Sequence, residues 1–251
     1  MNLDYGPLST LFYDASKPVG YSLNGDLAFY LKQAAQCGGR LLEPAVGTGR
    51  MLIPLLEAGF EVDGLDRSAD MLARCREHCQ ARGLSAQLLQ ADMAAFALPL
   101  RYAGILLPAG SFCLITELEQ ARAALACFHH HLLPGGRLVL DIEPPPSTPW
   151  QPSSTRLTLA NGRTLTLDCS VANFEPEQQR YELALHYRLM EGEQVVAEEQ
   201  QPFPLRWYHA EQMQRLLETS GFEVESVLSD YRVSGVQSGA EMLTFIARRK
   251  K

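Results

Sequence analysis

Residues 41–56 read LLEPAVGTGRMLIPLL, and this stretch decides the fold. An apolar run that ends in Glu43 is followed by a turn of small residues and then by a segment whose apolar residues have helical spacing. Gly47 and Gly49 lack a Cβ atom, so the chain can turn sharply there and a ligand can approach the backbone closely. The stretch therefore predicts a strand, a tight turn and a helix that together bind a nucleotide.

Short apolar runs and helical stretches alternate around this turn, from Arg40 to Glu143. Such alternation predicts a parallel sheet with helices on both faces. The pattern resumes at Leu205 with a helix and two strands, FEVESVLS and EMLTFIARR, which are joined by a loop. Consecutive strands without a crossover helix pair most simply as an antiparallel hairpin, so we expect a reversed pair at the edge of the sheet.

The segment between these two parts, residues 144–205, has a different pattern. An Asn-Gly pair at residues 161 and 162 joins two strand-like runs, and this dipeptide is a strong hairpin signal. Alternation in a later run puts apolar side chains on one face, which predicts one packed side and one side facing water or a partner. We therefore predict an inserted antiparallel β-meander that covers a substrate, contacts a second subunit, or does both. Its expected strands are residues 155–160, 163–172, 180–190 and 195–201.

The composition disfavours several classes of protein. The chain has 251 residues with 46% hydrophobic residues, which is enough for a sizeable core. Its 22 Lys and Arg against 29 Asp and Glu give a net charge of −7, which argues against a nucleic-acid partner. The longest apolar stretch, Ala103–Ile115, is far shorter than the roughly 20 residues of a membrane helix. The first residues do not have the cationic start and apolar core of a secretion signal.

The six cysteines are spread along the chain and fall mostly within apolar patterns. That distribution is typical of reduced, buried thiols, so we expect a cytoplasmic location. Cys75, His78 and Cys79 would share one helix face, as metal ligands do. Because the two cysteines belong to an apolar stripe and no fourth ligand is evident, we predict a buried helix face and no metal site.

A carboxylate at the end of the second expected strand adds to the nucleotide site. Asp66 lies 17 residues after Gly49, where an acidic side chain can accept hydrogen bonds from both ribose hydroxyls of an adenosine. A dinucleotide site usually has the pattern G-x-G-x-x-G, but Leu52 stands at the third glycine position. Glu43 would be poorly placed beside a pyrophosphate and would suit a ligand with an ammonium or sulfonium charge. An NAD-dependent oxidoreductase is therefore the less favoured alternative.

Four motifs in order resemble the class I S-adenosylmethionine-dependent methyltransferases: LLEPAVGTGR at 41–50, GLDRSADML at 64–72, LLQADMAAF at 88–96 and HLLPGGRLVLDI at 131–142. The chain departs from the family pattern at Ala45, which replaces the first glycine of the first motif, and at Gly104, where the family usually has an acid. The resemblance implies an α/β fold with a Rossmann-like, mostly parallel seven-stranded sheet and a reversed C-terminal hairpin. It implies one methyltransferase domain, residues 1–143 and 206–251, in which residues 1–39 form a helical cover, and S-adenosylmethionine as the cofactor.

The resemblance also assigns roles to single residues. Gly47 and Gly49 would pass near the amino-acid end of the cofactor, Glu43 would help to orient that end, and Asp66 would hold the ribose. The cofactor-binding residues that it implies are Tyr13, Glu43, Ala45, Gly47, Gly49, Asp66, Arg67, Asp92, Met93 and Pro108.

Asp92 and Met93, after the third expected strand, would contact the amino group and one face of the adenine. The alternative for Asp92 is that it only caps the next turn. In the family, the segment that corresponds to Pro108–Phe112 places the methyl donor beside the acceptor. FYDASKP at 12–18 resembles a segment that covers the cofactor in many small-molecule members, so Tyr13 is either a contact to the sulfonium or a packed aromatic residue.

The acceptor pocket is expected between Pro108–Phe112, the N-terminal segment and the meander. The alternative for the aromatic residues near 207 is that they pack and that His209 begins the next helix. No general base is assigned, because methyl transfer from a sulfonium depends mainly on proximity and alignment. The candidates for the acceptor pocket are Tyr21, Ser111, Phe112, Trp207 and Tyr208.

The predicted activity is methyl transfer to a nitrogen, oxygen or carboxyl group of a small molecule. Enzymes that methylate exocyclic amines of bases resemble one another in an Asn/Asp-Pro-Pro-aromatic loop, whereas this chain has LPAG at 107–110. Cytosine C5 enzymes have a Pro-Cys pair there, but Cys113 lies five residues past Pro108. A non-catalytic protein that binds an adenosine ligand would share the same site and is the second alternative.

Overall fold

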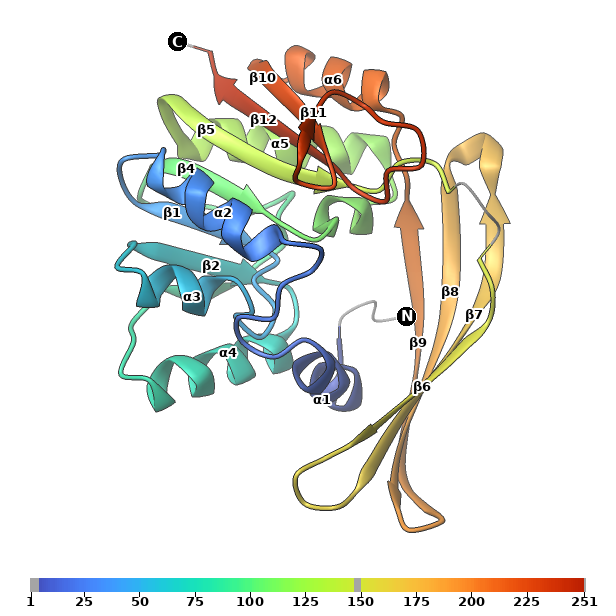
Figure 1. The fold of residues 1–251 in the computed structure, drawn as a ribbon. Helices are drawn as coiled ribbons and strands as arrows, with labels where there is room; N and C mark the ends of the chain where they lie inside the picture. The colour runs from blue at the N-terminus through green and yellow to red at the C-terminus, as the bar shows by residue number, and fades with distance from the viewer. Residues whose placement is uncertain (1–4, 147–149, 251) are drawn as a thin grey trace.

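The computed structural model describes residues 5–146 and 150–250 and contains two β-sheets and six α-helices within those ranges (Figure 1). Residues 1–4 of the expected N-terminal cover and 147–149 of the expected insertion lie outside the described residues. The larger sheet consists of β1 (Leu41–Pro44), β2 (Val62–Asp66), β3 (Leu88–Gln90), β4 (Tyr102–Leu107), β5 (Leu132–Ile142), β10 (Phe222–Ser229), β11 (Val233–Ser234) and β12 (Leu243–Arg249). The smaller sheet consists of β6 (Ser153–Thr158), β7 (Thr164–Glu175), β8 (Arg180–Glu191) and β9 (Gln194–Arg206). The helices are α1 (Pro7–Ser16), α2 (Asp26–Ala35), α3 (Leu52–Glu57), α4 (Ala69–Ala81), α5 (Leu118–His131) and α6 (Ala210–Thr219), with short 3-10 helices η1 (Ser111–Leu114) and η2 (Pro176–Gln178).

The larger sheet is mostly parallel, as the sequence predicts. Its strand order is β11-β10-β12-β5-β4-β1-β2-β3. The strands β5, β4, β1, β2 and β3 run parallel, whereas β12 pairs antiparallel with both β5 and β10. The expected fold class, with its reversed hairpin, is therefore confirmed. The two-residue strand β11, which no sequence signal indicated, is added to the seven expected strands.

The central strands are buried on both faces, because their apolar side chains belong alternately to two cores. Leu41 of β1 packs with residues of α2, α3 and α4, whereas its neighbour Leu42 packs with residues of α5 and α6. In β4, Leu106 belongs to the first core and Leu107 to the second. Successive side chains of a strand point to opposite faces, so these continuous apolar runs require helices on both sides of the sheet.

The first strand leads into α3 through the glycine turn. The helix begins at Leu52, and Pro54 therefore lies in its first turn, where a proline is tolerated. Gly49 has a φ of +88°, and a Cβ atom there would lie 2.9 Å from Cys75 Sγ and 3.1 Å from the Ile53 side chain. This close contact of the turn with α3 and α4 leaves room only for glycine at position 49.

The strands β6 to β9 form the inserted antiparallel meander that the sequence predicts. Asn161 and Gly162 lie in the turn between β6 and β7, where Gly162 has a φ of +81°. One face of β8 is packed against the rest of the fold, and the long strands extend well beyond the larger sheet (Figure 1). The buried residues on that face are Tyr181, Leu183, Leu185 and Tyr187.

The helix α1 lies between the meander and the larger sheet (Figure 1). At its first turn, the Glu199 carboxylate of β9 accepts hydrogen bonds from two backbone N–H groups at 2.8 and 3.3 Å, which are donors that a helix leaves unpaired. At its other end, the Asp14 carboxylate accepts a hydrogen bond from Arg74 Nε at 2.7 Å and lies 2.7 Å from His78 Nε2. Both partners belong to α4, so α1 is attached to both parts of the fold and holds Tyr13 near the glycine turn.

Candidate functional site

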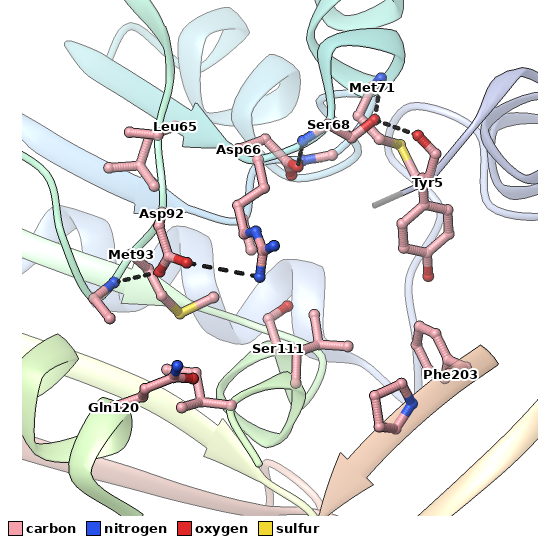
Figure 2. A pocket seen from close by; sticks show the side chains of 18 of the residues that line it. Tyr5, Leu65, Asp66, Ser68, Met71, Asp92, Met93, Ser111, Gln120 and Phe203 are labelled. Carbon is pink, nitrogen blue, oxygen red and sulfur yellow. Dashed lines mark hydrogen bonds and ion pairs between the residues drawn. The ribbon is translucent and has the colours of Figure 1, made fainter. Parts of the chain in front are cut away.

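A cavity lies at the carboxyl edge of the larger sheet, where β1, β2, β3 and β4 end (Figure 2). Open α/β sheets bind their ligands at this edge. Eight of the residues that the sequence predicts for the cofactor or the acceptor line it: Tyr13, Ala45, Gly47, Asp66, Arg67, Asp92, Met93 and Ser111. Five further lining residues were not predicted from the sequence: Tyr5, Ser68, Met71, Gln120 and Phe203.

Asp66 is fixed at the end of β2 by two backbone hydrogen bonds. Its Oδ2 accepts a bond from Gly47 N at 2.8 Å, and its Oδ1 accepts one from Ser68 N at 2.9 Å. A carboxylate can accept about four hydrogen bonds, so these two orient the group and still allow it to accept others. The bonds join the glycine turn, β2 and the start of α4 into one unit that presents a carboxylate to the cavity.

Asp92 presents a second carboxylate next to the end of β3 (Figure 2). Its Oδ1 accepts a hydrogen bond from Ala94 N at 2.7 Å, so the turn-capping role that was the alternative interpretation is present. Its Oδ2 lies 3.6 Å from Arg67 Nη1, and both side chains are about half exposed. The neighbouring Met93 is buried and forms an apolar part of the wall. Asp92 thus offers a hydrogen-bond acceptor that suits the adenine amino group, and Met93 offers an apolar surface that suits the adenine ring.

The turn after β1 has a backbone conformation that brings it close to a ligand. Ala45 and Gly47 have φ values of +53° and +56°. In this region a non-glycine residue costs about 1–2 kcal/mol, so Ala45 takes the place of the family's first glycine with some strain. A Cβ atom at Gly47 would lie 3.8 Å from Tyr13 and 3.9 Å from Met71, and both of these line the cavity. A side chain at position 47 would therefore fill the cavity, and the glycine present there fits a bound cofactor.

Glu43 lies behind this turn, away from the cavity lining. Its side chain is 2% exposed, and its Oε2 has no hydrogen-bond partner among the described residues. Burial raises the pKa of Glu43 well above its usual value, although the charge of Arg50 lowers it in part. Burying an unpartnered charged oxygen is costly, so the side chain is poised to take up a proton or a polar partner. Its predicted role at the amino-acid end of the cofactor stays a prediction.

Aromatic residues from distant parts of the chain close the cavity on another side (Figure 2). The ring of Tyr5 packs edge to face on Tyr13 and on Phe203 of β9, with 6.1 Å between centroids in each pair. The Ser68 hydroxyl donates a hydrogen bond to the Tyr5 carbonyl at 2.7 Å, which holds this segment against α4. Tyr5 and Phe203 lie outside the four sequence motifs and reach the cavity only through tertiary packing, so no local pattern signalled them.

Seven predicted residues lie outside this lining: Tyr21, Glu43, Gly49, Pro108, Phe112, Trp207 and Tyr208. Gly49 faces the core, for the packing reason given above. Pro108 is buried, and its carbonyl accepts a hydrogen bond from the Ser111 hydroxyl at 2.9 Å. It therefore shapes the loop after β4 that brings Ser111 to the cavity.

The aromatic candidates for the acceptor pocket are placed by packing. Phe112 and Tyr208 are fully buried and contact each other with 5.6 Å between ring centroids. Trp207 is also buried, and His209 is the residue that precedes α6, as the alternative interpretation expected. Tyr21 is exposed, and its carbonyl accepts a hydrogen bond from Arg50 Nη1 at 2.7 Å. Burial in the core thus keeps the rings of Phe112, Trp207 and Tyr208 out of the cavity, whereas Tyr21 lies at the surface.

Within residues 5–146 and 150–250, no group of three or more His, Cys, Asp and Glu side chains is arranged to hold a metal ion. Cys75 and Cys79 of α4 are buried in the core, and His78 of the same helix contacts Asp14. The six cysteines are free thiols. No helix in the described part of the chain is long and apolar enough to cross a membrane.

Comparison with known proteins agrees with this geometry. Residues 41–136 match the methyltransferase domain family. The chain is 35% identical over 116 residues to a glycine/sarcosine N-methyltransferase from Halorhodospira halochloris, a match that covers 45% of this chain and 43% of that enzyme. It is 28% identical over 202 residues to the dTDP-3-amino-3,6-dideoxy-alpha-D-glucopyranose N,N-dimethyltransferase from Streptomyces fradiae, with 80% and 76% covered. The match therefore spans less than half the length of the first relative and about three quarters of the second.

A solved structure matches the fold over nearly the whole chain. An S-adenosylmethionine-dependent methyltransferase from Clostridium acetobutylicum superposes with a TM-score of 0.79 and covers 96% of this chain and 97% of its own, at 16% identity. The resemblance found in the sequence is thus confirmed by the domain match and by the fold. Residues 41–136 thus match the methyltransferase domain family, and nearly the whole chain has the fold of a solved S-adenosylmethionine-dependent methyltransferase.

Proposed function

We propose that this chain transfers a methyl group from S-adenosylmethionine to an amine nitrogen of a small molecule. The observation that carries the proposal is the cavity where Asp66, Asp92 and the turn at Gly47 lie together. In it, Asp66 would accept hydrogen bonds from the ribose and Asp92 from the adenine amino group, with Met93 against the adenine face. Both relatives named above are N-methyltransferases, one acting on glycine or sarcosine and one on an amino sugar, which supports nitrogen as the acceptor atom.

The reaction needs little chemistry from side chains. When bound, S-adenosylmethionine supplies a methyl group on a positively charged sulfur, and the N–C bond forms as the C–S bond breaks, with the amine proton released to water. The protein holds the amine in line with that bond, and such positioning corresponds to effective molarities of about 10⁵–10⁸ M. Tyr5, Tyr13 and Phe203 close one side of the cavity and so help to exclude water from it.

Titration calorimetry tests the cofactor assignment. We expect S-adenosylmethionine and S-adenosylhomocysteine to bind in the micromolar range and NADH to give no heat. The reverse result would favour the oxidoreductase alternative and reject this proposal. Release of S-adenosylhomocysteine in the presence of glycine, sarcosine or D-glucosamine, measured against a reaction without an amine, then separates an enzyme from a non-catalytic adenosine-binding protein.

We also propose that residues 1–143 and 206–251 form the methyltransferase domain and that 144–205 are an insertion that covers the substrate or joins two subunits. The exposed apolar side chains of the meander support a homodimer, and the net charge of −7 supports a small-molecule substrate over a nucleic acid. Sedimentation equilibrium tests the dimer, which a monomer at all concentrations would contradict. Free cysteines support a cytoplasmic location, which cell fractionation tests.

A further inference from the structure

A second hollow lies beside the first cavity, next to the ends of β4 and β5. Its volume of about 600 Å³ is that of a small-molecule site, for which roughly 300–1,000 Å³ is usual. Ala109 lines this hollow and Ser111, two residues further along the same loop, lines the first cavity. Among its described lining residues are two carboxylates, Glu143 and Glu241, and no Lys or Arg. The hollow therefore attracts a cation.

Glu143 is the more deeply placed of the two carboxylates. Its Oε2 accepts a hydrogen bond from the Tyr181 hydroxyl at 2.6 Å, and its Oε1 faces the loop after β4, 3.6 Å from where a Cβ atom of Gly110 would stand. Burial raises the pKa of Glu143, whereas the Tyr181 hydrogen bond and the Lys17 ammonium lower it. The Lys17 Nζ lies 5.1 Å from the ring centre of Tyr13, which lines the first cavity. The Lys17 ammonium thus lies within electrostatic reach of Glu143 and also beside a residue that lines the first cavity.

Aromatic rings form a row beside this carboxylate. The ring of Trp150 lies 5.8 Å from that of Tyr181 at an interplanar angle of 31°, and Tyr181 lies 6.0 Å from Trp207 at 30°. Phe174 continues the row at 5.5 Å from Trp207. The two ends, Trp150 and Phe174, are 44% and 51% exposed, whereas the middle rings are buried. Faces of aromatic rings attract cations, so the row and the carboxylate favour the same kind of ligand.

We propose that this second hollow binds the methyl acceptor as a cationic small-molecule amine, with its ammonium on the Glu143 carboxylate and its body against Trp150 and Tyr181. The bound ammonium gives up one proton to water before methyl transfer, because only the neutral amine has the lone pair that forms the N–C bond. The inference rests on the proposed function and adds the place and the charge of the acceptor. A hydrogen bond between an ammonium and a carboxylate is roughly twice as strong as one between neutral groups, so a neutral counterpart of the same shape binds less well.

Tryptophan fluorescence tests the proposal, because the chain has two tryptophans and both belong to the aromatic row. The full chain with bound S-adenosylhomocysteine is titrated with D-glucosamine and N-acetyl-D-glucosamine, and with benzylamine and benzyl alcohol. We expect each amine to give a saturable change and its neutral counterpart to bind about tenfold more weakly. In Glu143→Gln this preference disappears, and in Trp150→Leu most of the fluorescence change is lost.

Glu182→Gln is the matched control, since Glu182 follows Tyr181 in β8 but lines a hollow on the opposite face of the meander. It should keep the preference for amines. Equal binding of amines and neutral counterparts to the unmodified chain, or an unchanged preference in Glu143→Gln, would overturn the proposal. Calorimetry separates this result from the proposed function: a chain that binds S-adenosylhomocysteine without preferring amines loses only the acceptor assignment, whereas one that does not bind it loses both.

Discussion

We expect Asp66→Ala to weaken the binding of S-adenosylhomocysteine roughly 100-fold in titration calorimetry. A hydrogen bond to a charged group is worth about 1.5–3 kcal/mol, and about 2.7 kcal/mol corresponds to a factor of 100. The substitution removes the proposed ribose acceptor and also leaves the backbone N–H groups of Gly47 and Ser68 without the carboxylate that they now contact. The glycine turn is then held less firmly against β2, which adds to the loss.

Asp70→Ala is the control for this experiment, because Asp70 is exposed in the first turn of α4 and its loss changes the net charge equally. Its affinity for S-adenosylhomocysteine should equal that of the unmodified chain. If Asp66→Ala kept full affinity while circular dichroism showed a folded protein, Asp66 would not be the residue that holds the ribose.

Asp26→Asn is expected to have the largest effect on stability, a loss of about 3–5 kcal/mol in the free energy of unfolding. Asp26 Oδ2 lies 2.6 Å from Arg50 Nη2, and the two side chains are 0% and 4% exposed. The substitution leaves the guanidinium buried without its counter-charge. For a chain of this length such a loss lowers the melting temperature by roughly 10 °C, which differential scanning calorimetry measures.

The control for Asp26→Asn is a substitution that removes an exposed ion pair of the meander. Arg163 Nε lies 3.3 Å from Glu191 Oε1, and these side chains are 42% and 63% exposed. Water screens such a pair, so Glu191→Gln should change stability by less than about 1 kcal/mol. Equal losses in melting temperature for the two substitutions would show that the Asp26–Arg50 pair does not stabilise the fold more than an exposed ion pair does.

That several residues of the proposed cofactor site line one cavity could be predicted, because these residues are encoded locally. Asp66 is the last residue of a short strand, and Gly47 and Asp92 each follow one, all within contiguous motifs. The ends of neighbouring parallel strands meet at one edge of a sheet, so correct strands place these residues together without knowledge of other contacts. The same reasoning identified the meander, since its alternation and its Asn-Gly turn are also local signals.

The residues of the proposed acceptor site could not be predicted, because they come from positions far apart in the chain. Tyr181 contacts Glu143 from 38 residues away, and neither residue stands in a pattern typical of a binding site. Tyrosine is a residue type that is common in pockets, but the ring of Tyr208 is buried against Phe112. Whether an aromatic side chain faces a cavity or the core depends on which distant element covers it. No local sequence pattern indicates which element that is.

The position of β12 bears on how the chain completes its fold. Leu243 of β12 pairs with Ile142 of β5, 101 positions earlier (243 − 142), because the meander is inserted between them. Closing so long a loop lowers chain entropy, by an amount that grows with the logarithm of its length. The hairpins of the meander, residues 153–206, form from neighbouring strands and account for about half of that loop. Once they have formed, the remaining flexible chain is about half as long, which lowers the entropic cost of closure by about 0.6 kcal/mol. The meander, which contributes lining residues to both cavities, thus also assists the last strand in reaching the middle of the sheet.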